Sequence, residues 1–91
     1  MTPLPPGRYA SPPGVAWALD TEHVILVSGP GGAAHRVNGL AAAVWVWLSL
    51  GHGYERVVAL AAAAGGDQAA VDGLIALFVA QGLLQRQEGR P

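Results

Sequence analysis

The chain has 91 residues, of which 52% are hydrophobic and 12% are charged, and its formal net charge is −1. This length holds one small domain, and the composition is typical of a globular rather than a disordered protein. The near-neutral charge gives no electrostatic reason to expect a nucleic-acid partner, and the absence of cysteine excludes disulfides and thiolate metal sites.

The N-terminal segment is rich in proline. Residues 1–13 carry five of the seven prolines, and proline fixes φ and removes a backbone donor. We therefore expect an extended or disordered lead-in, followed by a folded domain over residues 14–84 and a polar tail over residues 85–91. Since the sequence has neither a secretory signal nor a run of about 18 apolar residues, we expect a cytoplasmic protein with no membrane contact.

Three strands are predicted in the first half of the chain. Residues 15–20, VAWALD, alternate, with Trp17 and Leu19 on one face. Residues 22–28, EHVILVS, are apolar and β-branched, and residues 33–38, AAHRVN, form a weaker third strand after the turn sequence GPGG. Together these segments predict an antiparallel three-stranded sheet.

Two helices are predicted next. Asn38 can cap the first, over residues 40–48, because its side chain can accept from the free amides of the opening turn. The second covers residues 54–64 and ends at Gly65 and Gly66, because glycine readily adopts the left-handed C-terminal cap. With a third helix, the order is β-β-β-α-α-α, an α+β domain.

The third predicted helix, capped by Asp67, is unusually apolar. Its predicted core stripe consists of Val71, Leu74, Ile75, Phe78 and Gly82. Leu77 and Val79 fall outside this stripe, so apolar surface is left over. This surface can pack on the first two helices, can form a homodimer, or can wall a groove in which an extended peptide pairs with an exposed strand edge.

The side-chain groupings that catalysis or metal binding needs are missing. The three histidines, His23, His35 and His52, lie in separate elements, without the short spacing of a metal-binding pair. The GPGG sequence joins two strands and has no following lysine, unlike a phosphate-binding loop, and the serines lack a nucleophile elbow. We expect no enzyme activity, no metal and no cofactor.

A winged-helix DNA-binding domain has the same inventory of elements. A recognition helix needs cations for the phosphates and long polar side chains for the base edges. No arginine or lysine occurs from Asp67 to Gln85. DNA binding is therefore the weaker interpretation, and we expect no nucleic-acid partner.

Three segments carry a family resemblance. The run HRVNGLAAAVWVWL is followed by a glycine-containing link, an Ala/Val-rich helix and the run VDGLIALFVAQGLL. In this order they resemble the PqqD-like family, the RiPP recognition elements, which bind the leader segment of ribosomally made peptide precursors. The resemblance covers about residues 15–84 and implies a winged helix-turn-helix-like fold.

The resemblance also implies a groove between the third strand and the third helix, in which the leader peptide adds as a further strand. The implied contact residues are Ala34, His35, Arg36 and Val37 on the strand and Gln68, Val71, Asp72, Leu74, Ile75 and Phe78 on the helix. Asp72 or Gln68 is placed to meet a polar or basic leader residue. Helical phase alone leaves open whether Leu74, Ile75 and Phe78 face the groove or the core.

Stand-alone domains of this family occur in lasso-peptide clusters. There they deliver the precursor to a leader peptidase, which is transglutaminase-like, and then to a cyclase. The resemblance therefore implies a non-catalytic leader-binding protein of this type. The alternative is a PqqD-type role, presenting a precursor to a radical SAM enzyme in pyrroloquinoline quinone synthesis.

Overall fold

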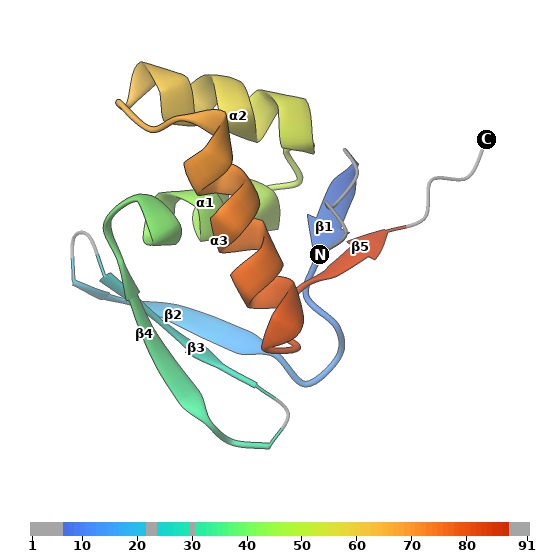
Figure 1. The fold of residues 1–91 in the computed structure, drawn as a ribbon. Helices are drawn as coiled ribbons and strands as arrows, with labels where there is room; N and C mark the ends of the chain where they lie inside the picture. The colour runs from blue at the N-terminus through green and yellow to red at the C-terminus, as the bar shows by residue number, and fades with distance from the viewer. Residues whose placement is uncertain (1–6, 22–23, 30, 88–91) are drawn as a thin grey trace.

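A computed structural model of the protein describes residues 7–21, 24–29 and 31–87 (Figure 1). The elements in chain order are β1 (Arg8–Ala10), β2 (Ala16–Thr21), β3 (Val24–Ser28), β4 (Ala34–Asn38), α1 (Gly39–Ser49), α2 (Tyr54–Ala63), α3 (Gln68–Ala80) and β5 (Gln85–Gln87). The three-stranded antiparallel sheet β2-β3-β4 and the three helices after it confirm the predicted α+β arrangement. Residues 22 and 23 of the second predicted strand and Pro30 of the predicted turn lie outside the described residues.

The helices cover one face of the sheet, and the side chains on that face of β3 are buried (Figure 1). Ile25 pairs with Val37 and Val27 pairs with His35 across the β3–β4 ladder. Side chains alternate along a strand, so these four share one face, and Leu26 lies on the other. Ile25, Val27 and Val37 are buried among the helices. With β3 central, β2 and β4 form the two edges of the sheet.

The two predicted N-terminal caps have different outcomes. Asp67 accepts a hydrogen bond from the amide of Ala70 at 2.8 Å, which confirms the cap on α3. Asn38 precedes α1 in an extended conformation, but its side chain makes no capping hydrogen bond, so this prediction is wrong. The chain begins α1 through Gly39 at a φ of 60°, which departs from the regular geometry that sets a cap side chain over the first-turn amides.

Glycines end α2 and α3. Gly65 has a φ of 93°, and the amide of Gly66 donates to the carbonyl of Ala61 at 2.7 Å, as predicted for a left-handed C-terminal cap. The helix α3 stops at Ala80, and Gly82 follows it at a φ of 76°. Gly82 therefore terminates the helix and does not belong to its core stripe, contrary to the prediction.

The ends of the domain differ from the prediction. Residues 1–13 were expected to lie outside the core and residues 85–91 to form a polar tail. Instead β1 and β5 pair antiparallel, and Tyr9 is only 3% exposed. The amide of Tyr54 donates to the carbonyl of Gly7 at 2.8 Å, which ties this segment to the start of α2.

Residues 8–10 belong to the fold because burial of the Tyr9 ring stabilises this segment. The β1–β5 ladder also supplies hydrogen-bond partners for its backbone amides and carbonyls. A proline-rich composition does not prevent three residues between prolines from pairing. Residues 1–6 and 88–91 of the predicted lead-in and tail lie outside the described residues.

Candidate functional site

The outer edge of β4 is open. The strand pairs with β3 from Val24 opposite Asn38 to Ser28 opposite Ala34. Within residues 7–21, 24–29 and 31–87, no strand pairs with its other side. Every second residue of an edge strand directs its amide and carbonyl outward, so this edge offers unpaired donors and acceptors.

A hollow of about 200 Å³ lies between this edge and α3. It is lined by His35, Arg36, Val37 and Asn38 of β4, by Ala41 of α1, by Leu74, Leu77 and Phe78 of α3, and by Gln81 after α3. The helix residues recur at the spacing of three and four that places them on one stripe. The wall is therefore apolar, and its polar groups lie along β4 and at the C-terminal end of α3.

The three apolar wall residues differ in exposure. Leu77 is 50% exposed, Leu74 is half-buried and Phe78 is buried. The ring of Phe78 packs against that of Trp45 in the core. The hollow is thus bounded by the core through Phe78 and by a solvent-exposed leucine at its rim.

The structure brings some of the implied contact residues to this hollow and not others. His35, Arg36, Val37, Leu74 and Phe78 line it. Ala34, exposed at the first position of β4, lies beyond its lining.

Val71 and Ile75 do not line it, because both are almost fully buried. Helical phase places them about 90° around the axis of α3 from the stripe that faces β4. For Ile75 the open choice between core and groove is decided in favour of the core, and Val71, which the resemblance implied as a contact residue, is a core residue too.

Gln68 and Asp72 lie elsewhere, contrary to the expectation that they meet the ligand. The hydroxyl of Tyr54 donates to Asp72 Oδ1 at 2.5 Å, and Gln68 Nε2 donates to the same hydroxyl at 2.9 Å. The hydrogen bond to Asp72 raises the pKa of Tyr54 above its ordinary value of 10.0. Both side chains therefore join α3 to α2 and are engaged there.

Four lining residues were missing from the implied set: Asn38, Ala41, Leu77 and Gln81. The sequence carried a signal for two of them. Leu77 falls outside the core stripe of α3, and an apolar residue off that stripe needs another explanation. Gln81 follows on the same face one turn later, so the phase of Leu77 also locates Gln81.

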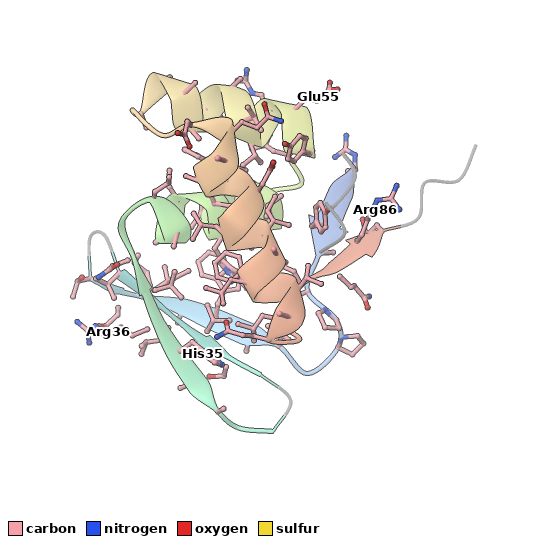
Figure 2. All side chains as sticks on the ribbon, in the orientation of Figure 1. His35, Arg36, Glu55 and Arg86 are labelled. Carbon is pink, nitrogen blue, oxygen red and sulfur yellow. The ribbon has the colours of Figure 1, made fainter. Side chains whose placement is uncertain are left out.

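The charged groups near the hollow point away from it. Arg36 is in register with Leu26, so its side chain leaves the sheet on the face opposite the helices. Its guanidinium lies 3.4 Å from the carboxylate of Asp20, and Figure 2 shows it directed away from α3. Among the described residues, no acidic side chain lines the hollow. The hollow therefore favours uncharged side chains.

A larger and more open hollow, of about 440 Å³, lies beside β1 and the start of α2. Its lining includes Arg8, Glu55 and Arg56, together with two glycines. The charges of both signs and the scarcity of apolar walls make it a poor site for recognising an apolar side chain.

In the described part of the chain, no three histidine or acidic residues are grouped so that they could hold a metal ion. None of the described helices is long and apolar enough to span a bilayer. Comparisons with protein-family models, with curated proteins and with solved structures find no match.

Proposed function

We propose that this protein binds the leader segment of a ribosomally made precursor peptide by adding it as a strand to β4. The observation that carries the proposal is the open edge of β4 directly beside the apolar hollow under α3. An added strand satisfies the outward amides and carbonyls of β4, and its alternate side chains enter the hollow. Binding without turnover is the whole role.

The register of β4 sets which ligand side chains matter. Leader residues opposite His35 and Val37 lie on the helix side of the sheet, so two side chains separated by one residue face the wall of Leu74 and Leu77. The leader residue between them lies on the outer face beside Arg36. The preferred ligand therefore has an apolar–polar–apolar pattern, with an acidic residue favoured at the middle position.

The affinity expected from these contacts is moderate. About four backbone hydrogen bonds contribute roughly 0.5–1.5 kcal/mol each, and two buried side chains contribute roughly 1.5–3 kcal/mol each. Ordering a flexible peptide costs several kcal/mol. The surplus is at most about 8 kcal/mol, which corresponds to a Kd of micromolar or weaker. Selectivity comes from the side chains, because any sequence supplies main-chain hydrogen bonds.

The pathway is part of the same proposal. We place the protein in lasso-peptide maturation, where it delivers the bound leader to a leader peptidase and a cyclase in the cytoplasm. The sequence resemblance supports this placement. If a radical SAM gene lies beside the gene for this protein, in place of peptidase and cyclase genes, the same groove would instead serve pyrroloquinoline quinone synthesis.

Hydrogen exchange with and without ligand tests strand addition. The ligand is a synthetic leader of the precursor peptide encoded in the neighbouring open reading frames. Its addition should slow exchange of the outward amides of β4 and leave those of β2, the other edge of the sheet, unchanged. Unaltered exchange in β4 under saturating leader, checked by calorimetric titration, would rule out this binding mode.

A further inference from the structure

The second edge of the sheet, strand β2, is also open and is unusually apolar. Among the described residues, β3 is its only strand partner, and every residue of β2 is exposed. Trp17 pairs with Val27 and Leu19 with Ile25, so both large side chains lie on the helix side of the sheet. They are nevertheless 41% and 66% exposed.

A second apolar hollow adjoins these side chains. It has a volume of about 220 Å³ and lies between the β2–β3 ladder and α1. Its lining includes Leu19, Ile25, Ala43, Val46 and Trp47 and has no charged residue among the described positions. The hollow under α3 is separate from it, and the two share no lining residue.

Apart from the irregularity between Leu19 and Thr21 at its end, the β2 edge lacks the features that keep edge strands from pairing with other chains. Monomeric proteins protect such edges with lysine, proline or inward-pointing charges. The sequence of β2, AWALDT, contains only one charge, Asp20. That carboxylate is already paired with Arg36 of the same chain.

We propose that a second copy of this chain pairs with β2, antiparallel about a twofold axis through Ala18. If the helices of both copies lie on the same face of the joined sheet, the twofold axis is perpendicular to that sheet. Directly opposed residues then point to the same face, and successive residues alternate, so the axis must pass beside one residue and its own copy and not between two successive residues. The axis at Ala18 sets Trp17 of each copy opposite Leu19 of the partner subunit. Cross-strand pairs of aromatic and aliphatic side chains are stabilising, and each indole reaches the margin of the hollow beside Leu19.

Neighbouring registers fit less well. An axis at Leu19 brings the irregularity between Leu19 and Thr21 into the new ladder, and an axis at Trp17 pairs fewer residues of β2. In the Ala18 register Asp20 lies opposite Ala16, so no charge meets a like charge.

The β4 edge is less suited to self-pairing. An antiparallel β4 pair about its central residue would set Arg36 against its own copy, and like charges directly opposite each other are destabilising even though Asp20 lies near each guanidinium. The net charge of −1 opposes association of whole chains only weakly. The resulting dimer has a continuous sheet with a β4 strand at each end, so both peptide grooves stay open.

Sedimentation analysis of the full chain over a concentration series tests the dimer. We expect the wild type to approach twice its monomer mass of 9.3 kDa. The Leu19→Lys variant should have a dimer Kd raised at least about tenfold. Leu50→Lys is the matched control, because Leu50 is 69% exposed and lines neither hollow, and it should dimerise like the wild type. A wild type that stays monomeric, or a Leu19→Lys variant that dimerises normally, would overturn the proposal.

Single cysteines test the register, since the chain has none of its own. Ala18→Cys should cross-link to its copy under mild oxidation, because directly opposed residues lie within disulfide reach. Arg36→Cys on β4, which would face its own copy in a β4 pair, should not. A dimer that cross-links through residue 36, or through neither position, contradicts pairing about Ala18. Leader titration of the same variants is independent of this result, so a failed dimer does not count against the β4 groove.

Discussion

The rings of Trp45 and Phe78 meet edge to face, with centroids 5.2 Å apart and an angle of 72° between their planes. This geometry is a favourable arrangement of two aromatic rings. Trp45 belongs to α1 and Phe78 to α3, and Phe78 also lines the hollow beside β4. The position of the groove wall is therefore set by the core itself, so substitutions there must be chosen to separate binding from folding.

Leu77 offers that separation. Leu77→Asp should weaken leader binding at least about tenfold, because burying a leucine contributes roughly 1.5–3 kcal/mol and each 1.4 kcal/mol is a factor of ten. Leu50→Asp, at a comparably exposed leucine away from the groove, should bind as the wild type does. Calorimetric titration of both variants measures the difference. Equal affinities would place the leader elsewhere on the molecule.

Ile75 and Leu77 should differ in their contribution to the free energy of unfolding. Ile75 is 1% exposed, so Ile75→Ala should lower the free energy of unfolding by about 2–5 kcal/mol through lost burial and a cavity. Leu77→Ala, at an exposed position, should change it by less than about 0.5 kcal/mol. Urea titration followed by circular dichroism measures both. A large loss of stability in Leu77→Ala would show that this side chain supports the core.

Replacement by alanine should change stability in opposite directions at Gly73, within α3, and at Gly82, just after it. Gly73 lies within the helix, and an added Cβ meets no atom within 4 Å, so Gly73→Ala should stabilise the fold by about 0.5–1 kcal/mol. Gly82 has a φ of 76°, where an L side chain is strained, so Gly82→Ala should destabilise it by about 1–2 kcal/mol. Thermal unfolding of the pair is a direct comparison, and a shift of the same sign in both would contradict the cap assigned to Gly82.

The hydrogen bond between Tyr54 and Asp72 should make part of the stability depend on pH. The bond raises the pKa of Tyr54 in the folded state, so its contribution is fully present below the unfolded value of about 10. It is lost as the pH rises through the higher folded value. Tyr54→Phe should cost about 0.5–1.5 kcal/mol at neutral pH.

Urea titrations of the wild type and Tyr54→Phe below and above pH 10 check this. The difference between the two proteins should shrink at the higher pH. Burial also raises the pKa of Tyr9, which is present in both proteins; its charge at high pH further disfavours ionised Tyr54, an interaction that only the wild type has. A constant difference would mean that Tyr54 is not held by Asp72.

The sheet and helices could be predicted because each has a local signal. Alternation over residues 15–20 and the cap at Asp67 depend only on near neighbours in the sequence, and both correspond to elements of the structure. The β1–β5 pair could not be predicted in this way. Its partners, such as Arg8 and Gln87, are separated by the whole domain, and three-residue strands have no detectable period.

The candidate site was predicted in place but not in detail. Its strand residues are those that the family resemblance implied, and they lie at an edge because β4 is the outer strand of the β2-β3-β4 sheet. On α3 the helical phase was compatible with two stripes, one through Ile75 and one through Leu77. Only the packing of α1 and α2 on the helix decides which stripe is covered. For the same reason the hydrogen bond from Tyr54 to Asp72 could not be predicted, because it depends on how α2 packs against α3.

The pairing of Arg8 with Gln87 has a practical consequence. The polypeptide comes into and departs from this domain at adjacent points, on the side away from β4 (Figure 1). An enzyme or an affinity handle tethered at either point therefore lies away from the β4 edge. The domain can also be inserted whole into a surface loop of a host protein, with the proposed leader site left accessible.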